Sequence, residues 1–113
     1  MVGNNGVGLL IDGTGSSGLS TVQIDDSLFA NNGASGITVN KAGVVISRSS
    51  AQDNAGNGIL AGPSSVIHIG NSAITGNFLA GLAFNGGQIL SYQNNMTKGN
   101  NVDNPPSGAL TLN

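Results

Sequence analysis

The feature that most constrains this chain is an asparagine that returns every 22 or 23 residues. Asn32, Asn54, Asn77 and Asn100 keep this spacing, and Asn4 precedes them by 28 residues. Self-similarity at a period of about 20 to 50 residues is the signature of architectures in which each repeat stacks on its neighbours. The period therefore predicts a stack of similar coils rather than one irregular globule.

A glycine follows each of the first four asparagines at a distance of four residues. These glycines are Gly8, Gly36, Gly58 and Gly81. We expect both columns to lie in turns, because asparagine and glycine tolerate the left-handed backbone that sharp turns need. Stacked asparagine side chains can also hydrogen-bond to one another along the coil axis. We therefore expect an asparagine ladder, and call its members the ladder asparagines.

Short segments of alternating apolar residues recur in each period, and no segment shows a helical stripe. The expected inward rows are Leu9/Ile37/Ile59/Leu82, Ile11/Val39/Ala61/Phe84, Val22/Val44/Ile67/Leu90 and Ile24/Ile46/Ile69/Tyr92. A further, mostly apolar row is Phe29/Ala51/Ile74/Thr97. A strand of about four residues is unstable alone, but stacked about 4.8 Å from its equivalent it gains a ladder and a shared core. The pattern predicts an all-β, single-stranded right-handed parallel β-helix of about four to five coils, with 22 to 23 residues per coil.

Residues 1–113 are expected to form one β-helix domain. The first period is longer by six residues, and we assign the extra length to a flexible loop over residues 12–20. Residues 101–113 are expected to form a C-terminal turn, built on Pro105 and Pro106, and a half-coil; prolines lack N–H donors and suit the edge of a stack. We expect the C-terminus to be a true end and the N-terminus to be cut from a longer protein.

These columns together resemble the parallel β-helix repeat of the pectate-lyase-like superfamily, over roughly residues 4 to 104. The stretch from Gly86 to Asn100 also resembles the last coil of bacterial exported β-helix proteins of unassigned function. The resemblance alone implies an exported or cell-surface location, because the residues themselves leave the compartment open. It also implies that any active site lies on the outer faces of the sheets.

Composition excludes several classes of function. Lys41, Arg48 and Lys98 lie far apart, so nucleic acid is not an expected partner. The absence of cysteine excludes disulfides and redox motifs, and no metal-ligand spacing is present, so we expect no metal or other cofactor. The apolar runs are too short to cross a bilayer, so we expect no membrane insertion.

Asp25, Asp26 and Arg48 form the single polar cluster worth weighing as a site. The adjacent aspartates resemble those of polygalacturonases, but that family's N-x-D, G-H-G and R-x-K motifs are absent. Asp26 and Arg48 lie one coil apart in one column, which favours a structural ion pair. His68 is a lone outward histidine. We therefore expect no catalytic residues and a chain that is not an enzyme.

The outward column of the first strand is apolar, where a solvated sheet face is normally polar. It comprises Leu10, Thr38, Leu60 and Ala83, with Leu110 as a candidate continuation. Such a patch predicts either self-association or coverage by residues 12–20 or the C-terminal segment. The first coil is a second adhesive surface, because its strand edges would be open.

Two functions follow, and the sequence leaves both open. The first is a non-enzymatic scaffold or surface-structural module that forms homo-oligomers, laterally or end to end. The alternative is a carbohydrate-binding or polysaccharide-processing module. Sugar binding usually needs exposed aromatic rings, and by the expected register Phe84 and Tyr92 point inward, which leaves Phe78 free. Ice binding is disfavoured, because no regular threonine column is present.

Overall fold

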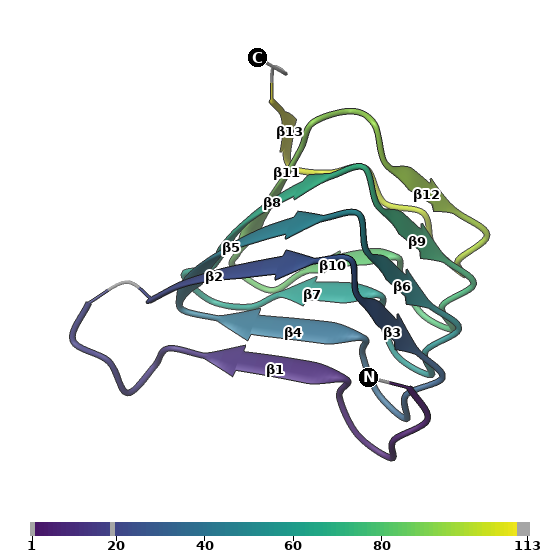
Figure 1. The fold of residues 1–113 in the computed structure, drawn as a ribbon, viewed down its shortest axis with the longest axis horizontal. Coiled ribbons are helices and arrows are strands. Elements are labelled where there is room, and N and C mark those ends of the chain that lie inside the picture. The colour runs from purple at the N-terminus through teal and green to yellow at the C-terminus, as the bar shows by residue number, and fades with distance from the viewer. Residues whose placement is uncertain (1, 19, 111–113) are drawn as a thin grey trace.

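The chain folds as a parallel β-solenoid of about four turns (Figure 1), as seen in a computed structural model that describes residues 2–18 and 20–110. Every strand pairing is parallel, and the described residues contain no helix. Each turn contributes one strand to each of three sheets, which form the three faces of the cylinder. The all-β coil architecture expected from the repeat is confirmed.

The three sheets contain 13 strands. The first sheet, in spatial order, is β1 (Leu9–Asp12), β4 (Ile37–Asn40), β7 (Ile59–Ala61) and β10 (Leu82–Phe84). The second is β2 (Ser20–Asp25), β5 (Ala42–Ser47), β8 (Val66–Gly70), β11 (Gln88–Ser91) and β13 (Gly108–Ala109). The third is β3 (Leu28–Ala30), β6 (Ser50–Gln52), β9 (Ala73–Thr75) and β12 (Met96–Lys98).

The core consists of like-on-like aliphatic stacks inside the cylinder. Ile37, Ile59 and Leu82 stack in the first sheet and are each almost fully buried. The expected rows of the first and third sheets occur in the register that the repeat predicts. Burying such aliphatic side chains contributes about 1.5–3 kcal/mol each, which is what lets three-residue strands persist.

The expected register of the second sheet is wrong in the last coil. Ile89, not Leu90, pairs with Ile67, and Ser91, not Tyr92, pairs with Ile69. Leu90 therefore continues the outward column of His68, and Tyr92 lies outward against Gly70.

The cause is one extra residue in the corner that follows β11. Asp26, Arg48, Asn71 and Gln93 share the left-handed corner position. The next inward residue comes three positions later in the first three coils, but four positions later in the last. The alignment by repeat spacing assigned this insertion to the strand before the corner.

The ladder asparagines and glycines occupy turns, but not for the expected reason. The positive φ angles fall on the residue before each ladder asparagine, namely Gly3, Asn31, Asp53, Gly76 and Gly99. Gly58 is instead required by close approach, because a Cβ there would lie 2.5 Å from Ile74 Cγ2 and 2.7 Å from Gly81 O. The expectation that these columns supply left-handed residues is therefore wrong.

Two segments depart from the regular coils, namely the loop after β1 and the C-terminal strand β13. The loop after β1 projects from the corner between the first and second sheets (Figure 1), and Lys41 Nζ donates to Ser16 O at 3.1 Å. Leu19 lies outside the described residues. β13 extends the second sheet beside β11, so Leu110 does not continue the first-sheet column, contrary to expectation. Residues 111–113 of the expected half-coil also lie outside the described residues.

Candidate functional site

The structure brings the predicted polar cluster together on one corner of the cylinder. Asp26 and Arg48 occupy the same left-handed turn position in successive coils. Arg48 Nε donates to Asp26 Oδ1 at 2.9 Å and Nη2 donates to Oδ2 at 3.3 Å. Asp25 ends β2, and its Oδ1 lies 3.9 Å from Arg48 Nη2. The cluster is thus the cross-coil ion pair that the repeat spacing favours.

The electrostatics of this cluster do not favour acid–base chemistry. The hydrogen bond from Arg48 lowers the pKa of Asp26, and the same bond raises the pKa of Arg48. Asp25 accepts hydrogen bonds from Gln23 Nε2 at 2.9 Å and from Ser47 Oγ. The lowered pKa keeps Asp26 ionised, and an ionised carboxylate paired with a guanidinium is a poor proton donor. His68 lies two strands away from Asp25 in the second sheet.

The ladder asparagines use their side chains inside the cylinder. Each Nδ2 donates to Oδ1 of the next ladder asparagine, at 2.8, 2.9, 2.9 and 2.7 Å from the first pair to the last. Each Oδ1 also accepts the backbone N–H of the preceding member. At the C-terminal end Asp103 Oδ1 accepts from Asn100 N and Nδ2, and this lowers the pKa of Asp103. The asparagine ladder is therefore structural, and a carboxylate ends it.

A second ladder lies at the corner between the second and third sheets, at the serine or asparagine position of the repeat, and its hydrogen bonds were not predicted from the sequence. Ser27 N donates to Ser49 Oγ at 3.2 Å, and Ser49 N donates to Ser72 Oγ at 3.2 Å. Asn95 takes the serine position in the last coil, with Ser72 N donating to its Oδ1 at 2.8 Å. These four positions are spaced by 22, 23 and 23 residues, as the last four ladder asparagines are.

The proposed interface column on the first sheet has the expected register. Leu10 pairs with Thr38, Thr38 with Leu60, and Leu60 with Ala83. Leu10 is 56% exposed, whereas the other three are half-buried. The exposed apolar surface of this column is therefore greatest at β1, on the first coil.

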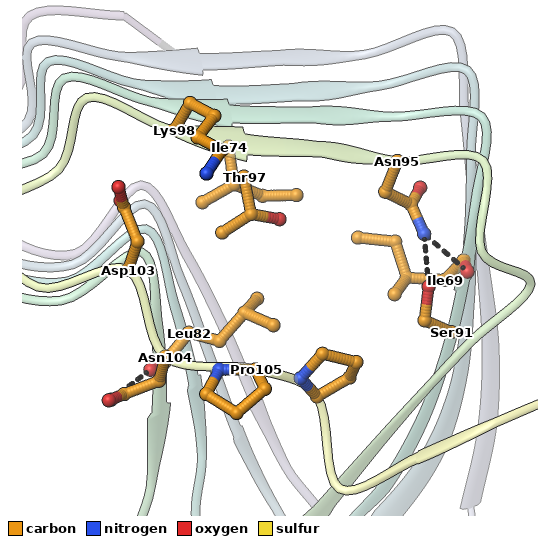
Figure 2. Close-up of a pocket in the computed structure, with 11 residues that line it drawn as sticks. Ile69, Ile74, Leu82, Ser91, Asn95, Thr97, Lys98, Asp103, Asn104 and Pro105 are labelled. Atoms are coloured by element: carbon orange, nitrogen blue, oxygen red, sulfur yellow. Dashed lines mark hydrogen bonds between the residues drawn. The ribbon is translucent and has the colours of Figure 1, made fainter.

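The two ends of the cylinder differ in polarity. At the first coil the inward residues Leu9, Ile11 and Val22 are only partly buried, and no described strand pairs with the outer edges of β1 and β2. At the last coil two inward rows end in the polar residues Ser91 and Thr97, and the other three end in Leu82, Phe84 and Ile89. There the chain crosses back through residues 101–107 and forms a half-open cavity of about 310 Å³ (Figure 2).

Aromatic rings lie on the outer surface, in part against expectation. Phe78 is 73% exposed, in agreement with its expected freedom. Phe84 keeps its inward row but is 38% exposed, because it belongs to the last strand of its sheet. Tyr92 lies outward, half-buried against Gly70. The argument that no aromatic besides Phe78 faces outward is therefore wrong.

The residues that the structure describes hold no group of three or more His, Cys, Asp or Glu side chains able to bind a metal ion. Within those same residues, no helix is long and apolar enough to span a membrane.

These features define a class, the parallel β-solenoid with internal polar ladders. The sequence model of the family described as the right-handed beta helix region matches residues 2–112, so the chain belongs to this family. The right-handed parallel β-helix expected from the repeat is thereby confirmed. No curated protein matches the chain. No solved structure matches it either.

Proposed function

We propose that this chain is a non-enzymatic β-helix scaffold that associates with further copies of itself through its open first coil. The observation that carries this proposal is the difference between the two ends of the cylinder. A solenoid end needs a polar cap to remain soluble alone. Asp103, Ser91 and Thr97 provide polar groups at the last coil, whereas Leu9, Ile11 and Val22 lie partly exposed at the first.

The strand edges of the first coil support this choice of surface. The N–H groups of successive residues in a strand point to opposite sides. Leu9 N donates to Gly36 O at 2.9 Å, so the N–H groups of Leu10 and Asp12 point to the open edge of β1. Such an edge invites pairing with another chain. The edge of β3 differs, because Gly3 N donates to Ala30 O at 3.0 Å and covers it.

The use of polar groups supports a scaffold rather than an enzyme. The amides of the ladder asparagines bond to one another, and the carboxylates of Asp25 and Asp26 bond to neighbouring side chains. The polar groups of these two sets are therefore engaged with one another rather than free to move a proton. We therefore propose that repetition and association, not turnover, carry the function.

The test compares equal charges at the two ends of the cylinder. Leu10 on β1 and Met96 on β12 are both 56% exposed. We expect Leu10→Lys to make the protein monomeric in concentration-dependent light scattering, and Met96→Lys to leave its oligomers unchanged. Leu60→Lys, in the middle of the first-sheet column, distinguishes lateral from end-on association. Far-UV circular dichroism confirms that each variant folds.

A wild-type protein that stays monomeric at high concentration would overturn the association. Loss of oligomers in Leu60→Lys as well as in Leu10→Lys would move the interface to the first-sheet column.

A second candidate is carbohydrate binding, and the outward position of Tyr92 favours it. Tyr92 and Asn94 both lie next to Gly70, since a Cβ there would meet Tyr92 Cδ2 at 3.1 Å and Asn94 Oδ1 at 3.5 Å. Asn94 and Arg48 also line an open groove at this corner. An aromatic ring beside amide and guanidinium groups suits a sugar. Titration with pectate and alginate, with and without calcium, tests it; Tyr92→Ala and Asp25→Ala should weaken any binding.

A further inference from the structure

The cavity at the last coil arises because the core rows lose their aliphatic residues there. Ser91 follows Ile69 in one row and Thr97 follows Ile74 in another. Ser107 and Asn104 continue the chain past Ile89 and Leu82, with Ser107 N donating to Ile89 O at 2.7 Å and Asn104 Nδ2 donating to Leu82 O at 3.0 Å. The shorter side chains and the crossing segment leave about 310 Å³ unfilled.

The floor and one wall of this cavity are apolar. Ile69, Ile74 and Leu82 form the floor, and Pro105 and Pro106 also line the cavity. Figure 2 shows Pro105 beside Leu82 and Asn104. The volume is near the lower limit, about 300 Å³, of sites that hold small molecules. The apolar floor would favour an aliphatic or aromatic group of a ligand.

Opposite charges lie at the rim without forming an ion pair within 4.0 Å. Lys98 and Asp103 both line the cavity, and Figure 2 shows their side chains facing each other at its left side. The charge of Lys98 helps to lower the pKa of Asp103, and the side chain of Lys98 makes no hydrogen bond to the residues that the structure describes. Asp103 Oδ1 accepts from Asn100 N and Nδ2, and a backbone hydrogen bond from Gly99 also lowers the pKa of Asp103. The rim thus offers one cation and one anion over an apolar floor.

We propose that this cavity binds a small zwitterion with an apolar side chain, of which a free aliphatic α-amino acid is the simplest example. The carboxylate of the ligand meets Lys98, its ammonium meets the carboxylate of Asp103, and its side chain lies on Ile69, Ile74 and Leu82. This site lies at the opposite end from the proposed association surface and does not depend on it. Because both charges are exposed, we expect a Kd of about 1 mM.

The first test titrates the isotope-labelled protein with leucine and follows amide chemical shifts by NMR. We expect saturable shifts confined to β12 and residues 103–107. N-acetylleucine lacks the ammonium and leucinamide lacks the carboxylate, so each should bind about tenfold more weakly. Glycine, which lacks the side chain, should cause no saturable shift.

The second test uses variants that separate the cavity from the fold. Thr97→Ile restores the aliphatic row and should fill the cavity, abolish leucine binding and leave the melting temperature equal or higher. Thr75→Ile makes the same change on the neighbouring strand at an outward position and should bind leucine as the wild type does. Lys98→Met should weaken leucine binding about tenfold, and Lys41→Met should not.

Three results would overturn the proposal. These are no saturable shift with leucine, equal affinity for leucine and its two blocked derivatives, or unchanged leucine binding in Thr97→Ile. If Thr97→Ile fails to fold, unchanged affinity in Lys98→Met is decisive against the site, because Lys98 is exposed and makes no contact on which folding depends.

Discussion

Gly58 lies where two neighbouring coils come closest. A Cβ built on it would lie 2.8 Å from Asn77 Nδ2, in addition to its contacts with Ile74 and Gly81. Equivalent crowding occurs at Gly8, Gly36 and Gly81, so the column records backbone approach rather than turn conformation. The spacing of these glycines is visible in the sequence, but this cause is visible only across coils.

We predict that Gly58→Ala destabilises the protein by about 2–3 kcal/mol, because overpacking of a filled site has this cost. Gly18→Ala is the matched control, since no atom lies within 4 Å of a Cβ at that position. Urea unfolding of both variants measures the difference. Equal stability of the two would show that the coils separate without cost at Gly58.

At the scale of elements, the ladder asparagines satisfy the hydrogen-bonding groups of the corners between strands. Helix caps and hairpin turns have this role in other folds. Asn54 Nδ2 donates to Asn77 Oδ1 and to Phe29 O, and Asn54 Oδ1 accepts from Asn32 N and Nδ2. All of these atoms are at buried or nearly buried positions. Each three-residue strand is therefore held by the corner beside it as well as by its own ladder.

We predict that Asn54→Leu costs about 3–5 kcal/mol, because several buried groups lose their partners and each unsatisfied group costs about 1–3 kcal/mol. Asn57→Leu is the control, because Asn57 Oδ1 accepts a single bond, from Ala80 N at 3.1 Å. It should cost about 1 kcal/mol. A chemical-denaturation series checks both, and a small loss in Asn54→Leu would contradict a structural role for the ladder.

At the scale of the whole molecule, the carboxylates with shifted pKa lie at the two ends of the cylinder. Hydrogen bonds from Thr14 lower the pKa of Asp12, and those from Arg48 and Asn100 lower the pKa of Asp26 and Asp103. A pKa lowered in the folded state contributes stability above the unfolded value of about 3.9. That stability is lost as the pH falls through the folded pKa.

We predict that acidification below about pH 4 loosens the ends of the cylinder before its middle. Hydrogen exchange, corrected for the intrinsic pH dependence, should accelerate in residues 9–14, 26–28 and 100–104, and remain slow in β5 and β8. In Asp103→Asn the acid-dependent acceleration should disappear at residues 100–104 and persist in the first coil. Uniform acceleration along the chain would contradict this prediction.

Much of the fold could be predicted from the repeat, and the misses have particular causes. The register of the second sheet failed at Tyr92 because one inserted residue near Asn94 has the same polar character as the corner around it. The serine column at Ser27, Ser49 and Ser72 is visible in the repeat, whereas its hydrogen bonds between coils are visible only in the tertiary structure. Asp103 accepts the backbone N–H of Asn100 in its own turn, and it also ends the asparagine ladder, which the repeat did not indicate.

By itself, the sequence determined the coil length, the inward rows and the ladder positions, because like residues must stack where every coil repeats the last. The tertiary structure decided which surfaces lack contacts from a neighbouring coil. Three features depend on contacts between coils: the exposure of Leu10, the approach of the Lys98 and Asp103 side chains, and the cavity in the last coil. A repeat describes what the coils share, whereas the two ends of the stack are where neighbouring coils no longer supply those contacts.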